Sequence, residues 1–407
     1  MRIFSTPEAA SVHMEREVDR EAEPFVQEVA AGVQLTAFPL ALGGGAFTNV
    51  YDVSWETANN PAGIHVPSRP LPVLDFARSQ HSTVTASGAF FFLADEASAL
   101  PPHMSLNLAV ADAGIRSLPV TDREALLCQN GEFMLMHVPA RGKLILNGRE
   151  LTWEGSRTGR VADCYAYGNG NAVINGLVHP VTGKARVLDE ASRRTPVLPA
   201  RAGWVDVAFR PTPGGEFVSS AVAANGELDI FSAHLVLRCP SWLVVSHGLN
   251  VLRIESIGPL SGERLPDAAV SVGPSLGLLG LAVHPINHDF SMGDNVGFGS
   301  RRLARMLLFA TADGLTHLRL FDGRPESRTF TGVTPDEASA AVSSEHNVTW
   351  GCFLDGGQTA KLCIRDADGH HTTYGNRHYL RWPDGAERGF RWTPDEGRPV
   401  GSLITLN

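Results

Sequence analysis

The sequence has few cysteines, no excess of positive charge and no long apolar run. Its five cysteines are scattered and form no C-x-x-C pair, which argues against a zinc site and against a disulfide framework. The formal net charge of -9 does not favour a polyanion-binding surface, so we expect no nucleic-acid partner. No stretch approaches the roughly 18 apolar residues of a membrane-spanning helix, so we expect no membrane partner either.

The N-terminal stretch MRIFSTPEAASVHMEREVDRE has no apolar core of the kind that secretory signals carry. We therefore expect a cytoplasmic protein with reduced thiols. The remaining composition, 43% hydrophobic and 19% charged residues, is that of an ordinary folded protein. The sequence does not indicate an oligomeric state.

Glycine (41 residues) and proline (26 residues) are plentiful, which favours many short strands joined by turns. Thr6 and Pro7 form a helix-start signal before a highly charged segment. We predict an α+β fold, a strand-rich mixed sheet core with few helices. We expect a helical extension over residues 1–27, one continuous main domain over 28–366 and a C-terminal extension packed on the core over 367–407.

The segment TPDEASAAV carries the clearest helix signal, because Thr334 and Glu337 form a capping box around a proline start. It lies between strand-like segments 317–321 and 350–354. Strand, helix and strand in this order favour two neighbouring parallel strands whose carboxyl ends share an edge of the sheet. We therefore expect Asp322 and Asp355, one at each strand end, to lie on the same rim. Asp-Gly is also a common turn dipeptide, so a plain turn remains the alternative at both positions.

The C-terminal segments ARMLLFATADG, LRLFDGR, TGVTPDEASAAV and WGCFLDGGQTA occur in an order that resembles the phosphodiester glycosidase family. In the N-terminal half, TASGAFFFL resembles the family's Asn-Gly-Gly-Phe-Phe run and places Ser87 at the asparagine. The resemblance spans roughly residues 28–366 and implies that this main domain is the catalytic domain. The sequence departs from the pattern at four positions expected to line the site: Ser87, Ala89, Phe309 and Gln358.

The resemblance implies a hydrolase that acts at the anomeric carbon of a sugar and cleaves a sugar-1-phosphodiester or a related glycoside. It implies catalytic roles for Asp355 beside the anomeric carbon, Asp322 as a base or hydroxyl-orienting group, and Arg305 as a fork for phosphate. The implied substrate-binding residues are Ser87, Gly88, Gly356, Gly357, Thr359 and Arg324. The substrate would be a small molecule or an oligosaccharide. The alternatives are a sugar-binding protein that has lost catalysis, or a glycosyl-transferring or cyclising enzyme on the same fold.

We expect no cofactor and no metal. His284 and His288 are four residues apart, but Pro285 weakens the helix that such a pair of ligands needs. A divalent cation held by acids is compatible with the composition, but no calcium-loop signature supports it.

Overall fold

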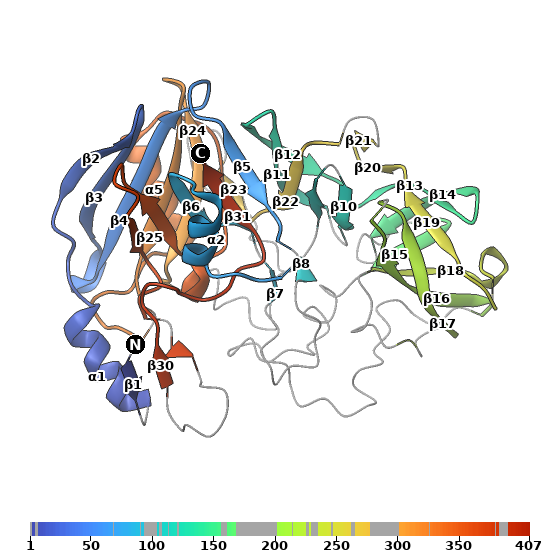
Figure 1. Ribbon diagram of the computed structural model, residues 1–407, viewed down its shortest axis with the longest axis horizontal. Coiled ribbons are helices and arrows are strands. Elements are labelled where there is room, and N and C mark those ends of the chain that lie inside the picture. Colours follow the sequence, from blue (N-terminus) through green and yellow to red (C-terminus); the bar gives the residue numbers. More distant parts are fainter. Residues whose placement is uncertain are drawn as a thin grey trace.

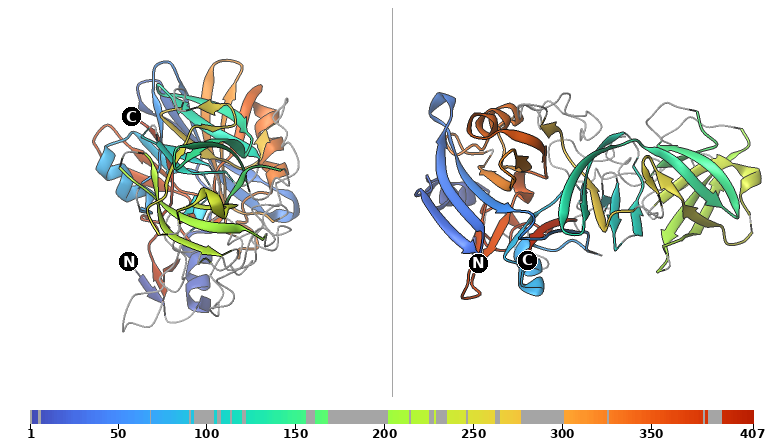
Figure 2. Two further views of the ribbon diagram at one scale, coloured as in Figure 1. Left: turned by 90° about the vertical axis from the view of Figure 1, so that its right-hand side faces the viewer. Right: turned by 90° about the horizontal axis from the view of Figure 1, so that it is seen from above.

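The computed structural model describes residues 2–4, 7–67, 69–89, 91–92, 104–105, 108–112, 114–119, 122–155, 161–167, 202–213, 215–224, 228, 235–245, 247–261, 265–276, 301–324, 326–378, 380–381 and 390–407. In this part of the chain, two packed sheets at one end of the molecule are followed by a third sheet and a closed barrel at the other end (Figures 1 and 2). No helix in the described ranges is long and apolar enough to cross a bilayer.

The seven-stranded sheet carries both predicted acidic strand ends. Every printed pairing within it is antiparallel. The helix α5 (Pro335–Glu345) packs on one face through a cluster that includes Leu307, Phe309 and Val342. In spatial order the strands are β2 (Phe25–Ala30), β3 (Val33–Ala41), β4 (Phe47–Glu56), β25 (Leu315–Asp322), β24 (Arg305–Thr311), β26 (Val348–Phe353) and β23 (Ser275–Leu276).

A second sheet, called here the β31 sheet, covers the other face of the seven-stranded sheet. One apolar cluster joins the two sheets, with Leu318 and Leu320 from β25 on one side and Leu362 and Ile404 on the other. The helix α2 (Val73–Gln80) packs on the outer face of the β31 sheet. The strands of this sheet are β28 (His371–Tyr374), β27 (Leu362–Arg365), β6 (Val84–Ser87), β31 (Leu403–Leu406) and β5 (Ala62–His65).

The middle of the chain forms a third sheet and the barrel. The third sheet contains β10 (Gly114–Ser117), β9 (Ala109–Ala111), β22 (Ala268–Ser271), β11 (Arg123–Gln129) and β12 (Glu132–Val138). The barrel closes through β13 (Arg141–Leu146), β14 (Arg149–Gly155), β15 (Cys164–Tyr167), β18 (Leu235–Pro240), β16 (Trp204–Pro211), β17 (Phe217–Ala224) and β19 (Val251–Ile254). A separate apolar cluster fills it, which includes Trp153, Phe209 and Phe217.

The N-terminal strand pairs with a segment from late in the chain. The strand β1 (Arg2–Phe4), before the helix α1 (Pro7–Glu17), pairs with β30 (Phe390–Trp392), which also pairs with β29 (Leu380–Arg381). The strand β31 lies between β6 and β5, so residues predicted as a C-terminal extension supply an inner strand of the β31 sheet. Two short hairpins complete the described strands: β7 (Phe91–Phe92) with β8 (Met104–Ser105), and β20 (Ser256–Ile257) with β21 (Leu260–Ser261).

The predicted fold class, α+β with a mixed sheet core, is wrong: the described chain is mostly β. Its α-helices in the described ranges are α1, α2 and α5, and its sheets are antiparallel apart from the pairing of β14 with β15. The abundant turn residues act here as hairpin connections, which join antiparallel strands. The strand–helix–strand pattern therefore indicated a local crossover and not the architecture of the whole sheet.

Candidate functional site

Three predicted motifs lie at the same end of neighbouring strands in the seven-stranded sheet, which is called here the sheet edge. The strand β24 lies between β25 and β26 and runs antiparallel to both, with Arg305 opposite Phe321 and Leu307 opposite Phe353. The start of β24 is therefore beside the ends of β25 and β26. The two acidic strand ends point the same way, as expected from the sequence, but their strands are not neighbours because β24 separates them.

The register also decides which face each side chain occupies. Residues directly opposite each other in an antiparallel pair share a face, so Arg305 lies on the face of Phe321, under α5. Asp322 follows Phe321 and points to the other face, toward the β31 sheet. The sheet edge thus brings Arg305 and Asp322 together in the fold but places their side chains on opposite faces.

The two glycines after Asp355 have different structural roles. A Cβ atom on Gly356 would lie 2.7 Å from the carbonyl oxygen of Ala304, so this position requires a close approach of two backbones. Gly357 has a φ of 65° and donates its N–H to the same carbonyl at 2.7 Å. The double glycine folds the chain tightly against the start of β24 and begins the short 3-10 turn Gly357–Thr359.

The carboxyl group of Asp355 is held by its own turn. Its Oδ1 atom accepts the N–H of Gly356 at 2.8 Å, and the Thr359 hydroxyl closes the turn by donating to the carbonyl oxygen of Gly356 at 2.6 Å. Burial raises the pKa of Asp355 to about 6, although the hydrogen bond from Gly356 and the charge of Arg398 oppose the shift. The N–H groups of Gly356 and Gly357, predicted to bind substrate, are therefore engaged inside the protein.

Asp322 is also buried and has a shifted pKa. Burial raises the pKa to about 6, against the opposing effects of the Gly323 N–H and of the positive charge of Lys361. The N–H of Gly323 donates to Oδ1 at 2.9 Å. Two carboxyl groups at this sheet edge thus titrate near neutrality, which is a common property of groups that exchange protons in catalysis.

Arg305, predicted to hold phosphate, is buried beside the first turn of α5. Its Nε atom donates to the carbonyl oxygen of Val333 at 3.1 Å and one Nη donates to that of Arg301 at 3.0 Å. Burial lowers its pKa to about 9. These contacts tie the start of β24 to the helix start, which is a structural use of the guanidinium fork.

Ser87 and Gly88 lie where the β31 sheet reaches Asp355. Ser87 is fully buried, and its hydroxyl accepts the N–H of Lys361 at 3.2 Å. The carbonyl oxygen of Gly88 accepts the N–H of Asp355 at 2.8 Å. A Cβ atom on Gly88 would lie 2.6 Å from the hydroxyl of Ser402, so only glycine fits this junction. Ser87 and Gly88 therefore hold the main chain on either side of the Gly356–Thr359 turn, at Lys361 and at Asp355.

Arg324, predicted to bind substrate, forms a two-point ion pair with Asp19. Its Nε and Nη2 atoms lie 3.1 and 2.7 Å from the two carboxylate oxygens, and both side chains are buried. The pair fastens the segment after α1 to the loop after β25. Arg324 is therefore part of the support around the site.

Sequence reasoning did not include three buried polar residues: Lys361 and Asn376, which both act on the pKa of Asp322, and His378, two residues after Asn376. They come from the loop before β27 and the loop after β28. Nothing in their spacing distinguishes them from loop residues, because only the packing of the β31 sheet on the seven-stranded sheet brings Lys361 and Asn376 near Asp322.

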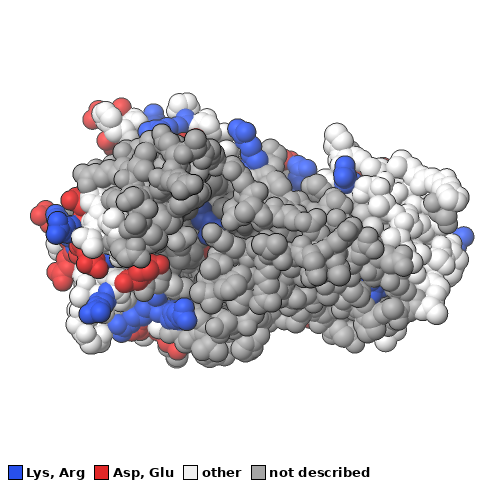
Figure 3. Space-filling model, turned by 90° about the horizontal axis from the view of Figure 1, so that it is seen from below, with Lys and Arg blue, Asp and Glu red and all other residues white. Residues whose placement is uncertain are grey.

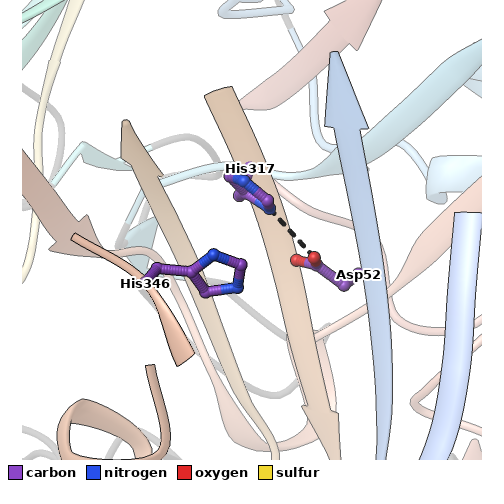
Figure 4. Close-up of side chains that lie close together, drawn as sticks. All are labelled: Asp52, His317 and His346. Carbon is purple, nitrogen blue, oxygen red and sulfur yellow. Dashed lines mark hydrogen bonds and ion pairs between the residues drawn. The ribbon is translucent and has the colours of Figure 1, made fainter. Parts of the chain in front are cut away.

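A second charged cluster, also missed, lies under α5. Asp52 on β4 accepts a hydrogen bond from His317 at 2.9 Å and from Nε of Arg319 at 3.1 Å, both on β25. The ring of His346, just after α5, points toward the same carboxylate (Figure 4). Burial alone would raise the pKa of Asp52, but Arg319 and His317 outweigh it and hold the pKa well below its usual range.

Asp52, His317 and His346 have the donor atoms of a metal site, but a guanidinium already connects them. One Nη of Arg319 lies 3.3 Å from Asp52 and 2.9 Å from Nε2 of His346. Because arginine only donates, His346 accepts this bond with a neutral ring. A cation would have to displace a buried positive charge, so the cluster fits an ion-pair network that holds α5 on the sheet.

The other expectations stay open. His284 and His288 lie outside the described residues, and the five cysteines are free and buried. At one end of the face in Figure 3, Lys and Arg side chains lie among Asp and Glu side chains. The expectations about partners and cellular location stay predictions.

No protein-family model and no curated protein matches the sequence. Among solved structures, a hypothetical protein from Synechocystis matches with a TM-score of 0.56 and 14% identity, over 95% of this chain and 64% of that chain. This likeness shows the fold alone, and the chain spans less than two thirds of that relative.

Two further solved structures match with lower scores. A putative exported protein from Burkholderia pseudomallei matches with a TM-score of 0.49 and 16% identity, over 88% of this chain and 74% of that one. The third match is the catalytic domain of zebrafish N-acetylglucosamine-1-phosphodiester alpha-N-acetylglucosaminidase, auto-inhibited by its pro-peptide. Its TM-score is 0.39 and its identity 11%, over 95% of this chain and 87% of that chain. Likenesses this weak carry no argument about function.

Proposed function

We propose that this protein is a glycosidase-type hydrolase that acts at the anomeric carbon of a sugar. The observation that carries the proposal is the pair of buried carboxyl groups at one sheet edge, Asp322 and Asp355, each with a pKa raised to about 6 by burial. Glycoside hydrolysis commonly uses two carboxyl groups, one that stabilises or attacks the anomeric carbon and one that moves a proton. A carboxyl group whose pKa lies near the working pH can both donate and accept a proton during the reaction.

We assign Asp355 to the anomeric carbon, because its loop is fixed on three sides. The N–H of Gly356 donates to its carboxyl group, the carbonyl oxygen of Gly88 accepts its main-chain N–H, and the Thr359 hydroxyl closes the turn by donating to the carbonyl oxygen of Gly356. We assign Asp322 to proton transfer or to a sugar hydroxyl. The positive charge of Lys361 favours its ionised form, while burial favours the neutral form.

The phosphodiester part of the proposal depends on the sequence resemblance. The guanidinium of Arg305 donates to main-chain carbonyl oxygens on the α5 face, away from the face of Asp322. We therefore propose a sugar as the recognised group and a phosphodiester or another aglycone as the leaving group.

The test is hydrolysis of a panel of nitrophenyl glycosides and a sugar-1-phosphodiester by the full chain. We expect Asp355→Asn and Asp322→Asn each to lower kcat by at least about 100-fold. The matched control is Asp368→Asn, at an exposed aspartate that also precedes a glycine. Turnover by the natural protein that is unchanged in both site variants would refute the assignment.

One observation favours a second candidate, a sugar-binding protein without catalysis. The donors expected to bind an oxyanion or phosphate, at Gly356, Gly357 and Arg305, are all engaged inside the protein. Sugar binding measured by calorimetry, with no turnover of any substrate in the panel, would support this candidate over the hydrolase.

A further inference from the structure

The loop after β28 places an asparagine amide in the interior with nothing to bind. Gly375 and Asn376 both have left-handed backbone, with φ of 71° and 47°. A Cβ atom on Gly375 would lie 2.6 Å from Leu320, so the turn is pressed against the seven-stranded sheet. Asn376 is fully buried, and neither its Nδ2 nor its Oδ1 has a hydrogen-bond partner among the described residues.

His378 adds two more such atoms. It is 4% exposed, and in the part of the chain that the structure describes neither ring nitrogen has a hydrogen-bond partner. Burial lowers its pKa to about 4, and the charges of Arg324 and Lys361 act in the same direction. The ring is therefore neutral near pH 7 and offers one donor and one acceptor.

Lys361 lies against the same asparagine. A Cβ atom on Gly397 would lie 3.2 Å from Nδ2 of Asn376 and 3.2 Å from Cδ of Lys361, so one glycine touches both side chains. The Lys361 ammonium has three N–H groups and donates one to the carbonyl oxygen of Pro394. Its charge is also among the groups that act on Asp322.

Leaving these atoms without partners is energetically expensive. Each buried polar group that loses its hydrogen bonds costs about 1–3 kcal/mol, and folded proteins leave few such groups. Asn376 and His378 are two residues apart in one loop and together carry four such atoms, which exceeds what packing alone explains. A ligand or ordered water therefore belongs among them.

The chemistry of the groups selects the kind of ligand. An apolar ligand would leave the polar atoms unsatisfied, and an anion would need donors only and would meet the Asp322 carboxyl. A polyhydroxyl ligand fits, because each hydroxyl both donates and accepts, as do the amide and the neutral imidazole. We propose that the side chains of Asn376, His378 and Lys361 bind the hydroxyl groups of one sugar ring beside the carboxyl group at the end of β25.

This subsite rests on the proposed function, since it supplies the sugar recognition that Asp355 and Asp322 need. It orients the ring by hydroxyl contacts, so it acts on binding more than on bond cleavage. Because the three side chains are buried, a sugar can reach them only when the segments of this same chain that cover them move.

The test is isothermal calorimetry of the full chain with glucose, galactose, mannose and their N-acetylamino forms, with inorganic phosphate as a separate arm. The variants are Asn376→Gly, which keeps the left-handed backbone, and His378→Phe, which keeps a ring but removes both nitrogens. The matched control is Asn130→Gly, at an exposed asparagine with a φ of 52°.

We expect at least one sugar to bind, and its affinity to fall about tenfold or more in each variant, which corresponds to about 1.4 kcal/mol. The control should bind as the natural protein does. The melting temperature should not fall in His378→Phe, because its nitrogens have no protein partner to lose.

Four results would overturn the subsite. Binding of phosphate and of no sugar would show an anion site, binding of neither would leave ordered water as the occupant, and sugar binding unchanged in both variants would place the sugar elsewhere. Turnover with an unaltered KM in the variants would reject the subsite and keep the hydrolase. Sugar binding that weakens in the variants, together with no turnover of any substrate, would keep the subsite and reject the hydrolase.

Discussion

Replacing Asp355 with asparagine should make the protein more stable at alkaline pH relative to the natural chain. Burial raises the pKa of this carboxyl group from 3.8 to about 6. A group whose pKa is raised on folding contributes full stability below its unfolded pKa, and that contribution is lost as the pH rises through the folded pKa. Because asparagine cannot ionise, the variant avoids this loss.

The magnitude follows from the size of the shift. A shift of roughly two pKa units corresponds to about 3 kcal/mol between the two protonation states. The free energy of unfolding of Asp355→Asn, minus that of the natural protein, should therefore rise by about 3 kcal/mol between about pH 4 and about pH 8. The amide oxygen can keep the hydrogen bond from Gly356, so few contacts change at the same time.

The assay is urea unfolding followed by tryptophan fluorescence and circular dichroism at both pH values. Asp368→Asn serves as the control, because this aspartate is exposed and also precedes a glycine. A stability difference for Asp355→Asn that is the same at both pH values would refute the reasoning that burial penalises the charged form.

Three more predictions concern the support around the site, each measured by thermal unfolding. Thr334→Ala removes the side chain that caps α5 and should cost about 1 kcal/mol; an unchanged melting temperature would contradict the capping role. Gly332→Ala puts a Cβ atom 2.2 Å from a main-chain oxygen and should destabilise by more than about 2 kcal/mol, whereas Gly357→Ala, with φ of 65° but open space, should cost less. Equal losses in these two would argue against the clash. Asp52→Asn removes the buried one of the two carboxylates that pair with Arg319, the other being Glu345, and should cost about 2–3 kcal/mol; a loss below about 1 kcal/mol would show that the pair is dispensable.

Local signals in the sequence predicted local structure well. The capping box at Thr334 forms as expected, with Glu337 reaching back to the N-cap. The order of strand, helix and strand correctly predicted that Asp322 and Asp355 lie at ends pointing the same way. These outcomes depend only on neighbouring residues and on the direction of the chain.

The sheet arrangement could not be obtained in the same way. The strand β24 inserts between β25 and β26, and this pairing turns a predicted parallel pair into an antiparallel sheet. Strand pairing depends on contacts between segments that are distant in the sequence. The alternation of apolar and polar residues along one strand does not encode which strand it pairs with.

The candidate site was predictable only in part for a related reason. Asp322 and Asp355 follow apolar strands, which is a visible pattern. Asn376 and Lys361 reach Asp322 through a left-handed turn and the packing of a second sheet. Neither feature appears in residue spacing. Arg305 sits at the predicted edge, yet the register of β24 turns its side chain to the opposite face.

The most direct test of the central claim is a crystal structure of Asp355→Asn soaked with an uncleaved sugar-1-phosphodiester. We expect the anomeric carbon to lie against residue 355, with a ring hydroxyl hydrogen-bonded to Asp322. A sugar bound on the barrel, or a sugar on the α5 face that contacts neither residue, would contradict the account.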